Sequence, residues 1–248
     1  MRDLSDSWGL SPTARDHERT FDEQLPHGLE PDAGSRARDE AALAVEPEIH
    51  APRLSRMPTT LVLVRHGETD WNRERRYQGH ADTPLNDAGR RQAGELAERL
   101  RTERLDAIYT SPLRRASETA EIIAVQHGLQ AKALEALREI DVGDWQGLTL
   151  DEVRTRYPEQ LDDAWHSGWP NGESHAELDA RVLPTLLDLG RRHHNEHVLG
   201  VTHAGPLRTA LAAAAGFSRE ESRARIGPLG NCSVHRFEIR RGVLRHAG

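Results

Sequence analysis

Short apolar runs alternate with amphipathic segments along the chain from about residue 58 onwards. Thr60–Val64 and Val198–Thr202 are runs of β-branched and aliphatic residues, which is typical of strands buried in a parallel sheet. Residues 86–100 instead place apolar side chains three and four positions apart behind Asn86, a favourable N-cap, and this spacing predicts a helix. Strands that alternate with helices in this way predict an α/β sandwich with a largely parallel central sheet.

The other elements continue this alternation. Ser174 and Glu177 have the spacing of a capping box, which predicts a helix that begins there and runs to about residue 193. Residues 137–147 have the composition of a loop. Further strands are predicted at 107–110, 232–239 and 243–246, and further helices at 112–127 and 205–215.

Residues 1–57 show neither helical nor strand periodicity, and prolines interrupt them repeatedly. Residues 1–56 carry 12 acidic and 7 basic side chains, whereas the rest of the chain is nearly balanced. A segment of this composition does not bury enough apolar surface to offset the entropy lost on ordering. We therefore expect a disordered acidic N-terminal extension, 1–57, and one domain, 58–248, although Met57 is also a candidate for the true start.

Charge and composition exclude several classes of partner. The formal net charge of −7 argues against nucleic acid or an anionic membrane surface as the main partner. Cys232 is the only cysteine, and the longest apolar run, Ala210–Ala215, is too short to span a bilayer. The first residues lack the apolar stretch of a secretory signal, and so we expect a cytoplasmic protein; the sequence leaves its oligomeric state open.

Two histidines follow two of the predicted strands directly. Arg65 and His66 come at the carboxyl end of the first strand, and His203 follows Val198–Thr202. Ligands bind at this edge of open α/β sheets, so the two histidines would meet above the sheet if their strands are neighbours. Either histidine alone could simply be a polar strand end, but both together, with arginines nearby, indicate a shared site.

Four other blocks rich in charged and small residues accompany the motif around His66. The five blocks are RHGET at 65–69, YQGHADTPLNDAG at 77–89, TSPLRRASETA at 110–120, LREIDVGDWQG at 137–147 and VTHAG at 201–205. In this order they resemble the histidine phosphatase superfamily, which includes cofactor-dependent phosphoglycerate mutases and broad phosphatases, over about residues 58–240. The resemblance implies a three-layer α/β/α sandwich like that of phosphoglycerate mutases, in agreement with the pattern of elements.

The resemblance also implies roles for individual residues. His66 would be the nucleophile that becomes phosphorylated, and Glu139 the proton donor. The phosphoryl group would be held by Arg65, Arg115 and His203, where Arg115 is chosen over Arg114 because it directly precedes an alanine as in the family pattern. On the substrate side, the matching positions are Asn72, Thr69, Gln78 and Gly79.

These residue types suit phosphoryl transfer. A neutral imidazole is nucleophilic near pH 7, and two guanidinium groups with a second, protonated histidine, His203, would stabilise the charge on the phosphoryl oxygens. The scheme needs neither a metal nor another cofactor. His193–His197 contains three histidines, but it misses the spacing of zinc-binding helices and is typical of a solvated helix end. Trp145, Trp165 and Trp169 either pack in the core or belong to a mobile cap.

Three functions remain open: a phosphatase for a small phosphorylated metabolite, a mutase, and a non-catalytic phosphate-binding protein. Every catalytic position is filled, which disfavours the last. Glu139 and His203 are only 64 positions apart, and mutases of the family carry a longer insertion there that shields the phosphohistidine from water. We therefore expect hydrolysis. Segments 137–149, 172–174 and 230–233 look similar to glucosyl-3-phosphoglycerate phosphatases, so phosphosugars and phosphoglycerates lead, with α-ribazole phosphate and phosphoprotein substrates as alternatives.

Overall fold

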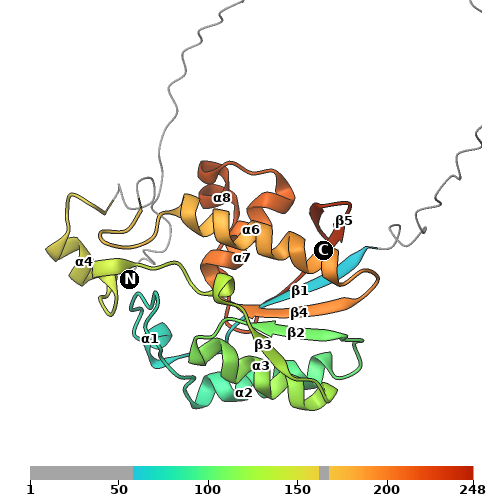
Figure 1. Ribbon diagram of the computed structural model, residues 1–248. Coiled ribbons are helices and arrows are strands. Elements are labelled where there is room, and N and C mark those ends of the chain that lie inside the picture. Colours follow the sequence, from blue (N-terminus) through green and yellow to red (C-terminus); the bar gives the residue numbers. More distant parts are fainter. Residues whose placement is uncertain (1–57, 162–167, 248) are drawn as a thin grey trace, which may run out of the picture. The chain divides into compact units, whose positions relative to one another are not determined.

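One mixed sheet forms the centre of the computed structural model, which describes residues 58–161 and 168–247. The strand order is β3-β2-β4-β1-β5-β6 (Figure 1). The first four strands of this order are parallel to one another. At one edge, β5 runs antiparallel to β1 and β6 runs antiparallel to β5. The predicted N-terminal extension and Trp165 lie outside the described residues. The strands are β1 (Thr59–Arg65), β2 (Ala107–Thr110), β3 (Ala131–Ala133), β4 (His197–Thr202), β5 (Val234–Arg240) and β6 (Val243–His246).

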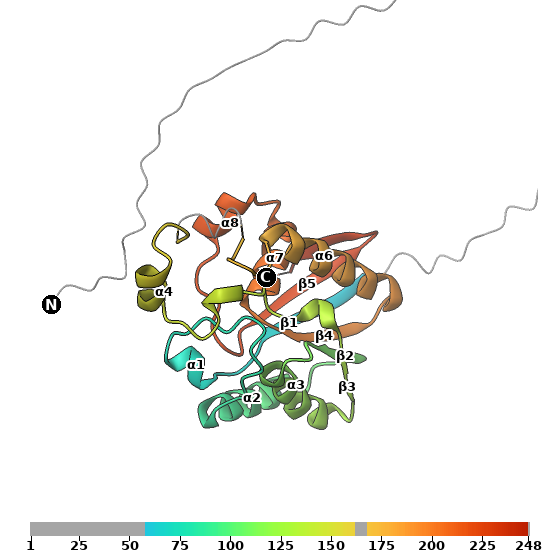
Figure 2. The ribbon, with the colours of Figure 1, turned by 60° about the vertical axis from the view of Figure 1, so that its left-hand side comes forward.

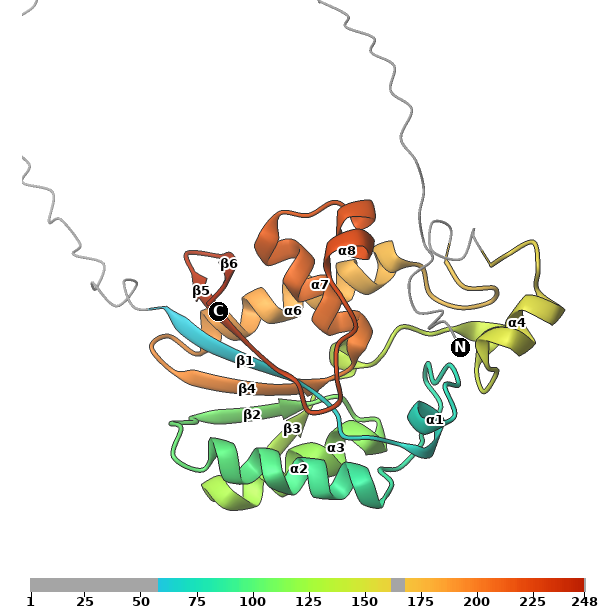
Figure 3. The same cartoon turned by 180° about the vertical axis from the view of Figure 1, so that it is seen from behind.

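Helices cover both faces of the sheet, which confirms the predicted α/β/α sandwich (Figure 3). Val62 and Val64 of β1 point to the face covered by α2 and α3, and Leu61 and Leu63 point to the face covered by α6 and α7. Strand side chains alternate between faces, so β1 contributes to both halves of the core. The helices are α1 (Asp70–Arg73), α2 (Asp87–Leu100), α3 (Arg114–His127), α4 (Leu150–Arg156), α6 (His175–Arg192), α7 (Ala204–Ala215) and α8 (Arg219–Arg225).

Side-chain caps mark where α2 and α6 begin. The Asn86 side chain accepts a hydrogen bond from the Gly89 amide at 2.8 Å and caps α2, as the sequence predicts. Ser174 and Glu177 form the predicted capping box of α6. The predicted loop at 137–147 contains the end of one short 3-10 turn, Glu135–Leu137, and all of a second, Gly143–Trp145. Strand β3 and the short helices α1, α4 and α8 were not predicted.

The pairing of β1 with β4 places the two histidines of the sequence motifs together. Arg65 pairs with Thr202 at the last step of the parallel ladder, and the His66 amide donates to the Thr202 carbonyl at 3.0 Å. His66 and His203 therefore leave the same sheet edge side by side. Helices α1 and α4 lie beyond this edge (Figure 2).

Candidate active site

His66 is buried, and its ring is held in one tautomer. Its Nδ1 lies 2.6 Å from the carbonyl oxygen of Gly67, which can only accept, so Nδ1 carries the proton and Nε2 keeps its lone pair. Burial first, and then the positive charges of Arg115 and Arg65, lower the pKa of His66 well below its ordinary value. The imidazole is therefore neutral at physiological pH, as a nucleophile must be.

His203 lies against His66, with ring centroids 5.1 Å apart. Arg115 Nε donates to His203 Nδ1 at 3.2 Å, so the proton of His203 sits on Nε2, 2.8 Å from the Ser111 hydroxyl. Burial, and then Arg115 and His66, lower the pKa of His203 well below its ordinary value. The expectation of a protonated His203 is thus wrong for the free protein, because the low-dielectric interior and the neighbouring cations disfavour a further charge.

Two arginines, the fully buried Arg115 and the partly buried Arg65, supply the positive charge. Arg115, at the start of α3, donates to the carbonyls of Ala81 at 2.6 Å and Gly79 at 2.8 Å, and burial lowers its pKa to about 10. It stays cationic at neutral pH. Arg65 donates to the Leu229 carbonyl, and its buried Nε has no hydrogen-bond acceptor within the described ranges. An unpartnered donor on a cation beside His66 suits an anionic ligand oxygen.

Glu139 reaches the same place from the segment that follows β3. Its Oε1 accepts from the Gly205 amide at the start of α7 and from the Ile140 amide, both at 2.9 Å. A Cβ atom on Gly205 would lie only 2.4 Å from this oxygen. Position 205 must therefore lack a side chain for the carboxylate to rest on the helix N-terminus.

A cavity of about 350 Å³ opens beside these groups. Asn72, Gln78 and Gly79 line it together with Arg65, His66, Arg115 and Glu139. Thr69 and His203 are fully buried and are not among the lining residues. Thr69 instead caps α1 and binds the Asn72 side chain. The Thr69 amide and the Thr69 hydroxyl both donate to Asn72 Oδ1 at 3.1 Å. Thr69 thus orients Asn72, which lines the cavity.

Several residues that contribute to the site are not predicted from the sequence. Asn231 donates to the His66 carbonyl at 3.0 Å, and Ser111 binds His203. The Gly205 amide is a backbone group, for which only the predicted start of a helix after His203 gave a signal. Of the tryptophans, Trp145 is buried in the core and Trp169 packs on it at 5.0 Å while lining the cavity.

His193 takes part in contacts within the domain. Its Nδ1 lies 2.5 Å from Glu196 and its Nε2 lies 2.9 Å from the Tyr109 hydroxyl. Across residues 58–161 and 168–247, no group of three or more His, Cys, Asp or Glu side chains is arranged to hold a metal ion. In the same ranges, no helix combines the length and apolarity needed to cross a membrane.

A neutral histidine flanked by arginines and a carboxylate, at the carboxyl edge of an α/β sheet, is an arrangement suited to phosphoryl transfer. Comparison with known proteins agrees: residues 61–246 match the family described as "Histidine phosphatase superfamily (branch 1)". The chain belongs to this family. The predicted phosphatase class is confirmed, since relatives of the chain include named phosphatases.

Three relatives illustrate the range of the family. The chain is 40% identical over 187 residues to phosphoglycerate mutase-like protein 4 of Arabidopsis thaliana, covering 72% of this chain and 79% of that protein. It is 39% identical over 160 residues to phosphoserine phosphatase 1 of Hydrogenobacter thermophilus, covering 63% and 76%. The solved structure of a mycobacterial glucosyl-3-phosphoglycerate phosphatase with VO3 has a TM-score of 0.68 and 32% identity, covering 77% of this chain and 97% of that one.

Proposed function

We propose that this protein is a metal-independent phosphomonoesterase that hydrolyses a small phosphorylated metabolite through a phosphohistidine at His66. The observation that carries the proposal is the state of that ring. His66 is neutral, its Nδ1 proton is held by the Gly67 carbonyl, and it lines the cavity beside two cations. A lone pair on Nε2 is thereby free to attack phosphorus.

The reaction has two steps. His66 Nε2 forms a bond to phosphorus while the bond to the ester oxygen breaks, and Glu139 gives its proton to that oxygen. Water then forms a bond to phosphorus, the Nε2–phosphorus bond breaks, and Glu139 takes the proton from the water. Arg65 and Arg115 stabilise the charge on the phosphoryl oxygens in both steps.

The cavity supports a phosphosugar or phosphoglycerate as the substrate. It follows one face of α7 past Ala204, Arg208 and Ala212. These positions span about 12 Å at the helical rise of about 1.5 Å per residue. Arg208 donates to the carbonyls of Ser222, Ile226 and Gly227, which carry no formal charge. Its positive charge is thus available to a second anionic group of the substrate, such as a carboxylate.

Water is the proposed acceptor of the phosphoryl group, and a second hydroxyl of a phosphoglycerate is the alternative. The short spacing between Glu139 and His203 supports hydrolysis, since it leaves little chain to cover the phosphohistidine. The names of the relatives include both phosphatases and a mutase-like protein. Isomerisation of 3-phosphoglycerate is therefore assayed beside hydrolysis.

Phosphate release, measured with excess chelator, tests the proposal. The panel contains sugar phosphates, 3-phosphoglycerate, glycerol 3-phosphate, phosphoserine, a phosphopeptide and an aryl phosphate, with His66→Ala as the control. We expect metal-independent release that His66→Ala abolishes, and 3-phosphoglycerate to exceed glycerol 3-phosphate, which lacks the carboxylate. Release that persists in His66→Ala, or that chelator removes, contradicts the mechanism. Preference for the phosphopeptide contradicts the substrate class.

A further inference from the structure

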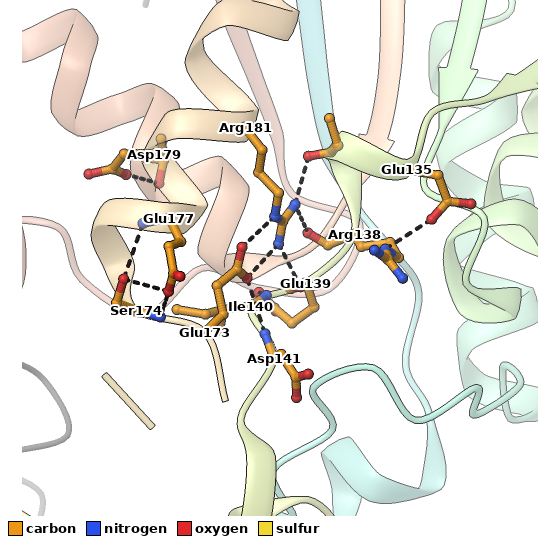
Figure 4. Close-up of polar contacts among 12 residues, drawn as sticks. Glu135, Arg138, Glu139, Ile140, Asp141, Glu173, Ser174, Glu177, Asp179 and Arg181 are labelled. Atoms are coloured by element: carbon orange, nitrogen blue, oxygen red, sulfur yellow. Dashed lines mark hydrogen bonds and ion pairs between the residues drawn. The ribbon is translucent and has the colours of Figure 1, made fainter. Parts of the chain in front are cut away.

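A network of hydrogen bonds ties the segment that carries Glu139 to helix α6 (Figure 4). Arg181 of α6 has five N–H donors, and each has an acceptor. Nη1 donates to the carbonyls of Ala136 at 2.7 Å and Arg138 at 2.9 Å, and Nη2 donates to that of Glu139 at 2.8 Å. Nε and Nη2 donate to the two carboxylate oxygens of Glu173 at 2.6 and 2.8 Å. The guanidinium is saturated.

Glu173 continues the network on the other side of Glu139. Its Oε2 accepts from the Asp141 amide at 3.2 Å, and its own amide donates to the Asp141 carbonyl at 2.9 Å. The neighbouring Gly172 packs so closely that a Cβ atom there would lie 2.5 Å from the same carbonyl. The main chain is therefore fixed both before and after Glu139.

Arg181 contacts the backbone of Glu139, whereas the carboxylate is bound elsewhere. The carboxylate Oε1 rests on the Gly205 amide of α7, and the Glu139 carbonyl receives Arg181 and also His80 Nε2 at 2.8 Å. The two ends of the residue are thus held by two different helices. A shift of the backbone would pull the carboxylate off the α7 terminus and away from the cavity.

We propose that Arg181 and Glu173 are positioning residues that hold Glu139 in place to protonate the leaving group. The inference rests on the proposed function, in which Glu139 is the proton donor. The side chains of Arg181 and Glu173 are only 22% and 14% exposed, so their bidentate pair is largely shielded from solvent. A proton donor must stay within hydrogen-bond reach of the ester oxygen, and small displacements of such groups cost rate.

The test uses phosphate monoesters whose alcohols differ in pKa, because an activated aryl leaving group needs no proton whereas an alkoxide does. The variants are Arg181→Gln, Arg181→Lys and Glu173→Gln. We expect kcat/KM for an alkyl phosphate to fall about tenfold or more in each, part of the roughly 10²- to 10⁴-fold that general acid catalysis supplies. For p-nitrophenyl phosphate the loss should stay below about threefold, since departure of that group does not use the donor.

Two controls isolate positioning from general stability. Arg191→Gln removes an exposed arginine of the same helix, 3.3 Å from Asp188, and should change neither ester. Combining Arg181→Gln with Glu139→Gln should add no further leaving-group-dependent loss, because Arg181 acts through Glu139. Melting temperatures and circular dichroism identify variants that do not fold. If Arg181→Gln does not fold, the near-isosteric Glu173→Gln is used to compare the two esters.

The outcomes separate this inference from the function beneath it. If Glu139→Gln itself lowers both ester types equally, Glu139 is not the donor, and the proposed mechanism and the inference both fail. If Glu139→Gln discriminates between the esters but folded Arg181→Gln and Glu173→Gln do not, the inference alone is overturned. Equal losses on both esters in these two variants would show that the network merely supports the fold.

Discussion

Burial of two neutral imidazoles makes the stability of the protein depend on pH. His66 and His203 have pKa values well below the ordinary value in the folded protein, with burial as the first cause in both. Below about pH 6.5 these two histidines therefore bind protons in the unfolded chain but stay neutral in the folded chain. Above that pH both histidines are neutral in the folded and the unfolded chain, and the free energy of unfolding is at its full value. As the pH falls below about 6.5, protonation of the unfolded chain lowers the free energy of unfolding.

We predict that the free energy of unfolding decreases between pH 7.5 and pH 5. His203→Gln should reduce the dependence of the free energy of unfolding on pH by up to about 1.4 kcal/mol per pH unit, because one fewer proton is taken up on unfolding. Urea denaturation at several pH values measures this. His194→Gln, which changes an exposed histidine, is the control variant. An unchanged slope in His203→Gln would show that His203 titrates normally in the folded state.

At Gly205, the absence of a Cβ atom lets the Glu139 carboxylate bind the backbone amide of α7. In Gly205→Ala the new Cβ would lie 2.4 Å from Glu139 Oε1, so the carboxylate must leave the α7 amide. We predict that kcat/KM for an alkyl phosphate falls at least about tenfold and that an aryl phosphate is spared, since general acid catalysis is worth about 10² or more. Steady-state kinetics on both esters measure it, and equal activity on the alkyl ester would contradict the placement of Glu139.

At the scale of elements, the strength of the local signal decided what the sequence could predict. Helices α2 and α6 are long and amphipathic, and their caps at Asn86 and Ser174 were recognised. Helices α4 and α8 also begin with capping boxes, at Thr149 and Ser218, but seven residues carry too little periodicity to show an apolar stripe. Strand β3 has three residues and exists because it pairs with β2, which local sequence does not encode.

Gly94 and Gly216 have similarly open surroundings but differ in backbone conformation. Around both Gly94, inside α2, and Gly216, after α7, an added Cβ would meet nothing within 4 Å. Gly216 has φ +68°, a left-handed conformation that costs a side chain energy, whereas Gly94 is helical. We predict that Gly94→Ala stabilises the protein by about 0.5–1 kcal/mol and that Gly216→Ala destabilises it by about 1 kcal/mol.

Urea denaturation of the two variants at one pH measures these changes. Because open space surrounds both positions, packing contributes little, and only the backbone conformation distinguishes them. Changes of the same sign in both variants would show that helix propensity and φ do not govern these sites.

At the scale of the whole molecule, the site is assembled from parts of the chain that are far apart. His66 follows β1, His203 follows β4, Arg115 opens α3 after β2, and Glu139 follows β3. The sequence placed the histidines at strand ends, and the parallel register of β1 and β4 then brings them together. Which distant side chains share the cavity, such as Arg208 of α7, depends on helix packing, and periodicity alone carries no information on that.

The start of β1 is also fixed by distant parts of the domain. The single Thr59 hydroxyl proton is shared between the carbonyls of Gly190 at 2.9 Å and His193 at 2.8 Å, and the Thr60 amide donates to the Glu196 carbonyl at 3.0 Å. Strand β1 is paired on both sides from its first residues. The six described strands and both halves of the core are formed by residues within 58–161 and 168–247.

We therefore predict that a chain beginning at Met57 keeps the melting temperature of the full protein within about 2 °C, since about 1 kcal/mol shifts a domain of this size by about 2–4 °C. Its kcat/KM on a small phosphate ester should be unchanged. Differential scanning calorimetry and steady-state kinetics on both chains provide the measurement. A chain that begins at Val62 is the matched control, because it loses Thr59 and its contacts and should unfold at a much lower temperature. If the chain from Met57 melts as early as this control, residues 1–56 contribute to the stability of the domain, and the predicted boundary at residue 57 is wrong.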